Sequence, residues 1–272
     1  MDKLTVIVTT YNKPEYLSKV LLGFTIQSNP NFEIVIADDG SKADTKEVVE
    51  WYRANTELDI EHVWQEDQGF RKCAILNKAI VTAKSDYLLF TDDDCVPRND
   101  FIEVHLQNAT PGYFLSGGYF KLNKTVTSKV TEESIRNQDI FRKEWLMEKG
   151  QERNFKLNKL RGDGLITGML NRITPTKATW NGHNVSGFKA DIIQVNGYNE
   201  DMAYGGLDRE LGERLINMGI KGKQIRYKAI CVHLDHSRPY KTKKLVHNNR
   251  SIRDAVKKDG ITFTPSGIDK YL

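Results

Sequence analysis

The chain has 272 residues, of which 39% are hydrophobic and 28% are charged, and its net charge is +4 at pH 7. These values are ordinary for a globular protein with a substantial core, and the charge is too small to indicate nucleic-acid binding by itself. Three scattered cysteines, Cys73, Cys95 and Cys231, exclude a disulfide framework and are expected to be reduced thiols, as is typical of a cytoplasmic protein.

No apolar stretch in the sequence approaches the length of a membrane span, and the N-terminal residues lack a signal-peptide pattern. We therefore expect a cytoplasmic protein, for which any association with a membrane would be peripheral.

The first 110 residues alternate between strand and helix patterns. Short β-branched and apolar runs predict strands at 4–10, 32–39, 60–65 and 86–94. Apolar residues at helical spacing predict helices between these strands at 14–24, 45–55 and 76–83. This order is typical of the α/β class with a doubly wound, mostly parallel sheet.

Polar residues gather where each predicted strand ends. They are Thr10, Tyr11 and Asn12 after the first strand, Asp38 and Asp39 after the second, Gln65 to Asp67 after the third, and Asp92, Asp93 and Asp94 at the end of the fourth. In an open α/β sheet the carboxyl ends of the parallel strands meet at one edge, and ligands bind there. Four independent solvated turns would give the same pattern, but a shared ligand site accounts for all four clusters at once.

The acidic triplet in "LLFTDDDCVP" is the most unusual of these clusters. Strand alternation predicts that Asp92 and Asp94 point the same way while Asp93 faces the opposite side. Two carboxylates on one side repel each other unless a cation lies between them or one is protonated. The alternative is a solvated acidic turn that precedes Pro97.

The second half of the chain is less regular. Residues 131–150 are predicted to form a charged surface helix, and 151–164 a mobile basic loop. A short helix closed by Gly197 is expected within 187–200, and a helix with an apolar stripe at 207–219, ended by Gly219. Residues 229–236 read as a last strand, and 241–258 as a basic helix or tail.

The motifs "VIVTTYNKPEYL", "VIADDGS", "WQEDQGFRKCAILNKAI" and "LLFTDDDCVPRNDFIEVH" together resemble those of the inverting family 2 glycosyltransferases, in their order and spacing. The resemblance is greatest to the chondroitin polymerase N-terminal type. The later segment "GHNVSGFKADIIQVNGYNEDMAYGGLDREL" resembles a galactosyltransferase-type acceptor segment. The resemblance implies one GT-A domain over 1–272, with a nucleotide-sugar-binding half at 1–120, an acceptor and catalytic half at 180–240 as a C-terminal extension, and a basic tail at 241–272.

A metal site is implied by the same resemblance. The triplet stands where the family has its DxD motif, so Asp94 would ligate a divalent cation, while Asp92 would contact the nucleotide's ribose or the metal. The imidazole candidates are His233 and His236 in "CVHLDHSRP". His233 is favoured, and strand alternation leads us to expect only one of the two as a ligand. The alternative for each is a satisfied core histidine. Oxygen ligands with an imidazole favour Mn²⁺, with Mg²⁺ as the other candidate.

The resemblance also implies a nucleotide site at the ends of the predicted strands. Asp38 or Asp39 would accept a hydrogen bond from the uracil ring, although an Asx turn through "DDGS" explains the same residues. Arg71 and Lys72, at a helix N-terminus, would contact a diphosphate, unless they face solvent. The full predicted set is Thr10, Tyr11, Asn12, Asp38, Asp39, Gln68, Arg71, Lys72, Asp92 and Asp93.

Asp208 in "YGGLDREL" stands where the family's GGED motif has its aspartate, which implies that it is the base for the acceptor hydroxyl. Gly205 and Gly206 would let the backbone pass close to the substrate. The alternative is that Asp208 only caps a helix. Leu207 replaces the family's usual glutamate, so acceptor contacts do not transfer by analogy. His183 and Asn184 are expected to line the substrate site, with a plain turn as the alternative reading.

The implied activity is transfer of a hexose or N-acetylhexosamine from a UDP-sugar to a hydroxyl of a saccharide or lipid-linked saccharide. Bacterial cell-surface polysaccharide or lipopolysaccharide synthesis is the expected setting. No nucleic-acid partner is expected, and the basic C-terminal tail could hold the protein at the inner face of the membrane. One alternative is a sugar-phosphate nucleotidyltransferase, but its glycine-rich N-terminal loop is missing here. The other is a catalytically silent carbohydrate-binding relative.

Overall fold

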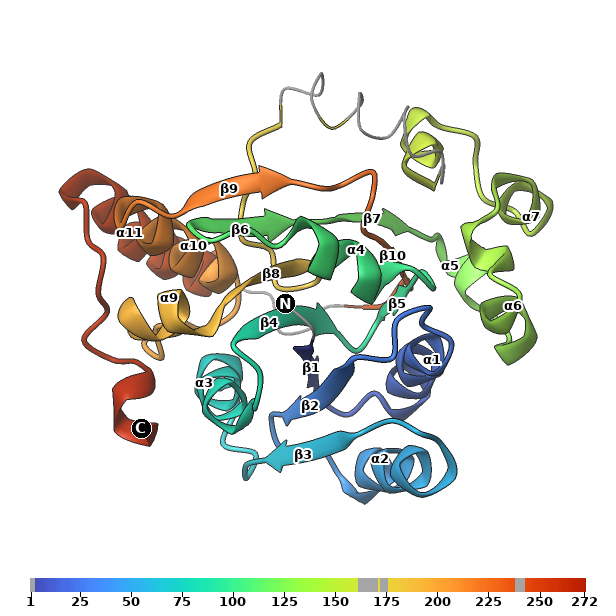
Figure 1. Ribbon diagram of the computed structural model, residues 1–272, viewed down its shortest axis with the longest axis horizontal. Coiled ribbons are helices and arrows are strands. Elements are labelled where there is room, and N and C mark those ends of the chain that lie inside the picture. The colour runs from blue at the N-terminus through green and yellow to red at the C-terminus, as the bar shows by residue number, and fades with distance from the viewer. Residues whose placement is uncertain (1–2, 161–170, 172–175, 238–242) are drawn as a thin grey trace.

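A computed structural model describes residues 3–160, 171, 176–237 and 243–272, with only the backbone at 243–246. Within these residues the chain builds a seven-stranded sheet and a three-stranded sheet (Figure 1). The large sheet has the order β3 (Ile60–Trp64), β2 (Phe32–Asp38), β1 (Leu4–Thr10), β4 (Tyr87–Asp92), β8 (Val185–Phe188), β6 (Tyr113–Ser116) and β9 (Lys221–Gln224). The small sheet has the order β5 (Cys95–Pro97), β10 (Ile230–His233) and β7 (Gly118–Lys121).

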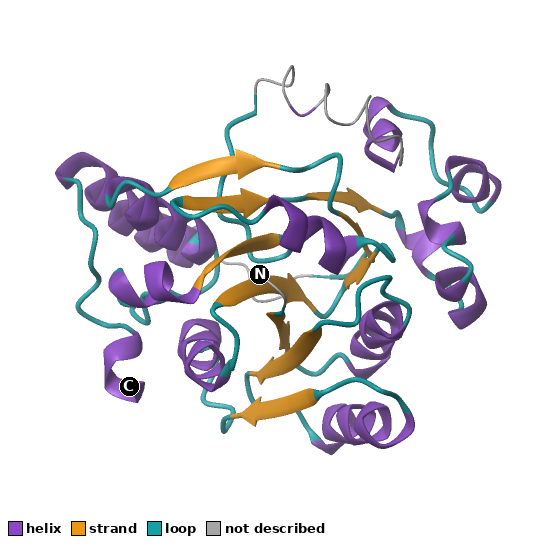
Figure 2. Cartoon of the chain, viewed as in Figure 1, coloured by secondary structure: helices purple, strands orange, loops and turns teal. Residues whose placement is uncertain are grey.

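The parallel half of the large sheet confirms the predicted α/β class. Strands β3, β2, β1 and β4 run parallel, and β1 is paired with both β2 and β4. The connecting helices are α1 (Pro14–Thr25), α2 (Ala43–Asn55) and α3 (Lys72–Thr82), and Figure 2 shows them on both sides of the strands. The sheet is therefore doubly wound, as the sequence predicts.

Alternation along the strands explains why both faces are apolar. In β1, Val6 and Val8 join the core cluster that contains α1 and α2, whereas Ile7 joins the cluster that contains α3. Successive side chains of a strand point to opposite faces, so a strand between two helical layers must be apolar at every position.

Strand β8 changes the direction of the sheet, because it is antiparallel to both of its neighbours, β4 and β6. Strand β9 then pairs parallel to β6. The remaining helices are α4 (Phe101–Asn108), α5 (Lys124–Thr127), α6 (Glu132–Arg136), α7 (Lys143–Glu148), α9 (Lys189–Gln194), α10 (Leu207–Asn217) and α11 (Lys243–Asp259). Short 3₁₀ helices lie at η1 (Asp139–Phe141), η2 (Phe155–Leu160) and η3 (Ile268–Tyr271).

The small sheet brings β10 next to the acidic triplet. Strand β10 pairs antiparallel with β5, and His233 lies opposite Cys95 in this register. On its other side β10 pairs parallel with β7. A strand from residue 230 onward thus ends beside Asp94, which immediately precedes β5.

The prediction of one long surface helix at 131–150 is wrong. The segment forms α6, η1 and α7, and the break comes at Gln138, whose backbone is left-handed with φ of 59°. An uninterrupted helix would spread its apolar residues around the surface, whereas the two breaks let Ile135, Ile140 and Leu146 all reach the core. Of the loop expected at 151–164, residues 151–154 are irregular, 155–160 form η2, and 161–164 lie outside the described residues.

The helix ends predicted from glycines are confirmed. Gly197 follows α9 with φ of +65°, and its N–H donates to the carbonyl of Ile192. Gly219 follows α10 with φ of +102°. Such left-handed positions carry little strain only for glycine. None of the helices in the described part of the chain has the length and apolar character needed to cross a membrane.

Candidate active site

A cavity of about 460 Å³ opens at the carboxyl edge of the parallel strands. Its walls come from the ends of β1, β2 and β4, the start of α3, the start of α10 and the end of β10. The predicted site residues that line it are Thr10, Tyr11, Asp39, Lys72, Asp92, Asp93, Asp94, Gly205, Gly206, Asp208, His233 and His236. Residues from 10 to 236 therefore meet at the edge that the strand pattern indicated.

All three carboxylates of the triplet face this cavity, which corrects the expectation that Asp93 points away. Strand β4 ends at Asp92, so alternation does not extend through the following turn. Asp93 accepts hydrogen bonds from the Thr10 hydroxyl at 2.9 Å and from Lys13 Nζ at 3.2 Å. Lys13 Nζ also lies 3.0 Å from Asp94 Oδ2.

Two lysines balance the negative charge of the triplet. Lys72 Nζ donates to Asp92 Oδ1 at 2.7 Å, and Thr9 Oγ1 donates to the same oxygen. Burial lowers the pKa of Lys72, but the charges of Asp92 and Asp208 outweigh this and raise it overall. Burial raises the pKa of Asp93 to about 7, even though Lys13 opposes the shift.

Asp94 lies at the centre of the candidate metal site. His236 Nε2 is 2.8 Å from its Oδ2, and His233 Nε2 is 3.6 Å from its Oδ1. Burial alone would raise the pKa of Asp94, but the two histidines and Lys13 hold it well below its usual range. The carboxylate is therefore ionised and available to a cation.

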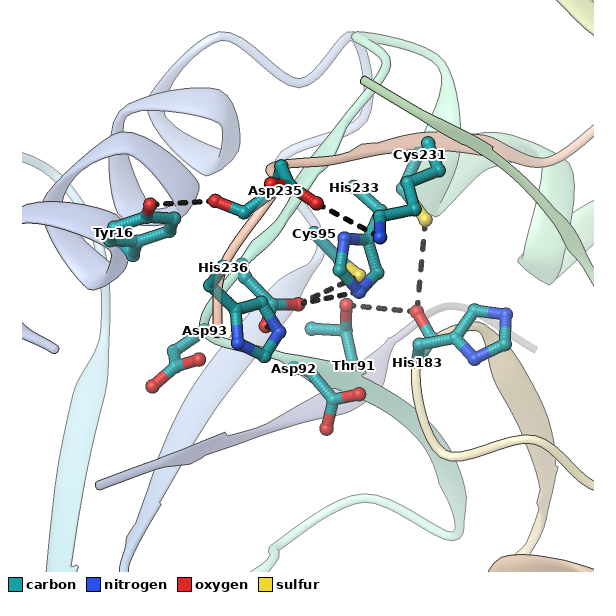
Figure 3. A network of polar contacts seen from close by, with 12 residues as sticks. Tyr16, Thr91, Asp92, Asp93, Cys95, His183, Cys231, His233, Asp235 and His236 are labelled. Atoms are coloured by element: carbon teal, nitrogen blue, oxygen red, sulfur yellow. Dashed lines mark hydrogen bonds and ion pairs between the residues drawn. The ribbon is translucent and has the colours of Figure 1, made fainter. Parts of the chain in front are cut away.

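Both histidines lie near Asp94, so the strand alternation from which a single histidine ligand was expected does not extend to His236. Strand β10 ends at His233, so the chain is free to turn before His236. The two rings are stacked, with centroids 5.4 Å apart and planes 11° from parallel (Figure 3). Carboxylate oxygens and imidazole nitrogens are ligands that divalent ions such as Mn²⁺ accept, so these residues fit the implied metal.

Asp208 lies in the first turn of α10 but does not cap it. The N-cap position is Gly206, and no side chain makes a capping hydrogen bond there. Asp208 Oδ1 is buried without a hydrogen-bond partner of ordinary geometry among the described residues. Burial raises the pKa of Asp208 to about 6, against the opposing effect of Lys72. A carboxylate that titrates near neutrality at the edge of a cavity can accept a proton there.

Gly182 provides the space that Asp208 occupies. A Cβ atom at residue 182 would lie 2.4 Å from Asp208 Oδ1, which is far too close. Position 182 therefore requires glycine because a larger residue would collide with the Asp208 carboxylate, in addition to any requirement of the turn.

Of the two aspartates at the end of β2, only Asp39 lines the cavity. Its carboxylate accepts hydrogen bonds from Gln65 Nε2 at 2.6 Å and from the N–H of Arg71 at 2.9 Å. Asp38 instead accepts from the N–H of Ser41 and contacts His62, as in the Asx turn expected as its alternative role.

Five other predicted residues do not line the cavity: Asn12, Gln68, Arg71, His183 and Asn184. Asn184 is fully buried, and its amide is bonded to the carbonyls of Gly118 and Ala229 and to His105. The Arg71 guanidinium donates to the carbonyl of Glu66 instead of turning inward.

The sequence analysis did not assign Lys13, Thr9 or Cys95 to the site. Thr9 belongs to the polar cluster at the end of the first strand and Lys13 follows it, so their position is the signal that could have found them. Cys95 Sγ donates to Asp94 Oδ1 at 3.4 Å, and its ligand atom lies within 4.8 Å of those of Asp94 and His233. Its place next to the acidic triplet was the only hint in the sequence.

Comparison with known proteins gives a consistent picture. The sequence model for glycosyl transferase family 2 matches residues 5–176. Chondroitin synthase of Pasteurella multocida (strain Pm70) is 36% identical over 104 residues, which are 38% of this chain and 11% of that protein. Validoxylamine A glucosyltransferase of Streptomyces hygroscopicus subsp. jinggangensis (strain 5008) is 28% identical over 239 residues, covering 80% of this chain and 52% of that one. The chain thus spans about half or less of these relatives' lengths.

Solved structures show the same fold at low sequence identity. Staphylococcus aureus TarS 1–349 in complex with UDP-GlcNAc has a TM-score of 0.62 at 16% identity, over 92% of this chain and 64% of that one. The mannosyltransferase PcManGT from Pyrobaculum calidifontis, in complex with GDP-Man and Mn²⁺, has a TM-score of 0.59 at 19% identity, over 88% and 58%. These likenesses establish the GT-A architecture expected from the motifs.

Proposed function

The chain belongs to glycosyl transferase family 2, and on that premise we propose that it transfers a hexose or N-acetylhexosamine from a UDP-sugar to a saccharide hydroxyl with inversion. The observation that carries the proposal is the placement of Asp208. Its buried carboxylate, with a pKa of about 6, shares one cavity with Asp92, Asp94 and two histidines. A proton acceptor and a cation site on one cavity are the two requirements of this reaction.

In the proposed reaction Asp208 takes the proton of the acceptor hydroxyl. The oxygen then forms a bond to the anomeric carbon, and the bond from that carbon to the diphosphate breaks, releasing UDP. A divalent ion held by Asp94 with His233 or His236 would stabilise the negative charge on the departing diphosphate. The positive charge of Lys72 interacts with both Asp92 and Asp208. It therefore favours the ionised form of the Asp208 carboxylate, the proposed base.

The donor contacts follow from the residues that line the cavity. We assign the uracil contact to Asp39, because Asp38 is held in its own turn. Thr10, Tyr11 and Lys72 supply further polar groups along the donor side. This assigns nucleotide-sugar binding to residues 1–120, and acceptor binding and catalysis to 180–240.

The acceptor in this proposal is a saccharide or a lipid-linked saccharide, as in bacterial cell-surface polysaccharide synthesis. The names of several relatives, chondroitin synthase among them, support this class. The basic segment 241–272 would place the protein at the inner face of the cell membrane. Support comes from α11, where Arg250 is exposed and lysines 257 and 258 occupy the last turn.

The test is release of UDP from a panel of UDP-sugars, measured with and without Mn²⁺ and with oligosaccharide acceptors. We expect one donor to give Mn²⁺-dependent release that acceptor accelerates, and a β-linked product from an α-linked donor. Pyrophosphate release from UTP and a sugar 1-phosphate would identify a nucleotidyltransferase instead. Donor binding without turnover, under every acceptor tried, would identify a silent relative.

A further inference from the structure

The two oxygens of the Asp94 carboxylate face different chemical surroundings. Oδ2 lies near His236 at 2.8 Å and Lys13 at 3.0 Å. Oδ1 lies near Cys95 Sγ at 3.4 Å and His233 Nε2 at 3.6 Å. The Oδ1 side therefore joins a thiol to an imidazole and a carboxylate, and the proposed function uses no thiol.

We propose that Asp94, Cys95 and His233 form a site for a thiophilic divalent ion such as Zn²⁺. It is distinct from the oxygen-rich coordination that suits Mn²⁺. The inference deepens the proposed function in one respect, since both ions would depend on Asp94. Its test nevertheless needs neither donor nor acceptor.

The spacings of Cys95 and His233 from Asp94 match those of tetrahedral zinc. Metal–ligand bonds of about 2.0–2.3 Å at tetrahedral angles place neighbouring ligand atoms about 3.3–3.8 Å apart. The distances of 3.4 Å from Asp94 Oδ1 to Cys95 Sγ and 3.6 Å to His233 Nε2 fall within this range. All three ligand atoms lie within 4.8 Å of one another, so one ion can reach them.

The fold holds these ligands in place. Cys95 and His233 lie close together (Figure 3) and are directly opposite each other in the β5–β10 pairing. Asp94 immediately precedes β5 in the chain. Leu234 N–H donates to the Asp94 carbonyl at 2.8 Å, which ties the two chain ends together. All three side chains are buried. Asp94 and His233 also line the cavity, and three protein ligands with the fourth position left to water or substrate are typical of catalytic zinc sites.

Ligand softness decides which ion this side prefers. A thiolate favours Zn²⁺ or Co²⁺ over Mn²⁺, which binds best to oxygen and imidazole. The thiol must lose its proton when the ion binds, and that proton passes to the solvent. Because Asp94 serves both ions, bound Zn²⁺ lowers the apparent affinity for Mn²⁺.

Cobalt provides a direct readout of the thiolate, because Co²⁺–thiolate coordination gives a near-ultraviolet charge-transfer absorption band. Metal-free protein is titrated with Co²⁺ alone. We expect the band to form, to disappear in Cys95→Ser, and to persist in Cys73→Ser, whose thiol lies elsewhere and donates to Met202. Zn²⁺ added to the Co²⁺-loaded protein should abolish the band.

A second variant keeps the test decisive if Cys95→Ser does not fold. The chain has three cysteines, so Cys73→Ser/Cys231→Ser leaves Cys95 as the only thiol. Its band, if present, must come from Cys95. Equilibrium dialysis measures the metal affinities of Cys95→Ser. The Zn²⁺ affinity should fall by more than about tenfold, because loss of a residue that only supports a ligand already costs about that much. The Mn²⁺ affinity should change less.

Two results separate this inference from the proposed function. Co²⁺ binding without a thiolate band, or a band that survives Cys95→Ser, overturns the thiophilic site alone. Failure of every divalent ion to bind overturns both the thiophilic site and the cation site of the proposed reaction.

Discussion

At the scale of single residues, Asp208 combines properties that rarely occur together. Its carboxylate is held at the start of α10, where the N-cap role belongs to Gly206. It is buried against Gly182 but opens to the cavity, and its pKa lies near 6. Burying a carboxyl group costs free energy of folding that a solvated carboxyl does not, and carboxyls with raised pKa values occur often at catalytic sites.

The variant Asp208→Asn should lose about 10²–10⁴-fold in turnover, because a neutral amide cannot accept the proton of the acceptor. UDP affinity and melting temperature should stay close to those of the parent, since Asp92, Asp94 and Asp39 remain. Asp201→Asn, an exposed change in the loop that precedes α10, is the matched control. Near-normal turnover of Asp208→Asn would end the assignment of this residue as the base.

The pH profile of the parent gives an independent check. Only the ionised form of Asp208 can act as base, and this form predominates above a pKa of about 6. We therefore expect kcat/KM to fall about tenfold for each pH unit below that value, and to level off above it. A profile that stays flat down to pH 5 would contradict a base with this pKa.

His233→Ala and His236→Ala should each weaken Mn²⁺ binding, because both rings reach the Asp94 carboxylate. Isothermal titration with Mn²⁺ measures the two affinities directly. His247→Ala, an exposed histidine of α11, is the control that should bind like the parent. If one of the two site variants binds Mn²⁺ unchanged, that histidine is not a ligand of this ion.

At the scale of secondary-structure elements, a buried ion pair fixes the position of α10. Arg214 Nε and Nη2 donate to Glu210 at 2.8 Å, one helical turn away. The same guanidinium donates to the carbonyls of Val195 and Gly197, in the turn after α9. The backbone of Tyr198, which follows this turn, exchanges two hydrogen bonds with Asn77 of α3. The helices that carry Asp208 and Lys72 are thus held in one network.

Arg214→Met should destabilise the protein by about 3–5 kcal/mol, because it leaves the Glu210 carboxylate buried without its partner. Urea unfolding measures the change. Glu210→Leu/Arg214→Met should recover much of the loss by removing both charges. Arg250→Met, on the exposed face of α11, should change stability by less than about 0.5 kcal/mol. A single Arg214→Met variant as stable as the parent would show that the ion pair does not hold α10.

At the scale of the whole molecule, a fully buried polar network crosses the centre of the large sheet. His105 of α4 contacts Ser186 Oγ at 2.7 Å and Asn184 Oδ1 at 2.9 Å. Tyr87 of β4 is bonded to the same serine at 2.9 Å. The network joins α4 to both β8 and β4, at the point where the strand direction changes.

Burial lowers the pKa of His105 to about 4, although its bond to Asn184 opposes the shift. An unfolded histidine titrates near 6.5, so between about pH 4 and 6.5 the unfolded chain binds more protons. The contribution of neutral His105 to the free energy of unfolding is therefore fully present above about pH 6.5. As the pH falls to about 4, the protein loses up to about 3 kcal/mol of this contribution.

The check is urea unfolding of the parent and of His105→Gln across that pH range. Carboxylates also contribute to acid destabilisation, but they are common to both proteins, so the difference in slope isolates His105. The variant should show a weaker dependence between pH 4 and 6.5. Equal slopes would mean that His105 is not neutral in the folded protein.

Local patterns determined much of this protein by themselves. Continuous apolar runs located β1 to β4 and helical apolar spacing located α1 to α3, because each element depends on residues close to it in the chain. The glycines that end α9 and α10 were also readable, since few residues other than glycine adopt their backbone angles without strain. Because parallel strands share one carboxyl edge, the sequence also placed the candidate site at that edge.

Tertiary structure decided which side chains meet there. The partners of the triplet, Lys13, Lys72 and His236, lie up to about 140 residues away, and no local pattern encodes such distances. The orientation of Asp93 depended on where β4 ends, and that of His236 on where β10 ends. Cys95 became a candidate ligand only through the pairing of β5 with β10. Alternation is reliable inside a strand, but strand ends and long-range pairings depend on packing of the whole chain.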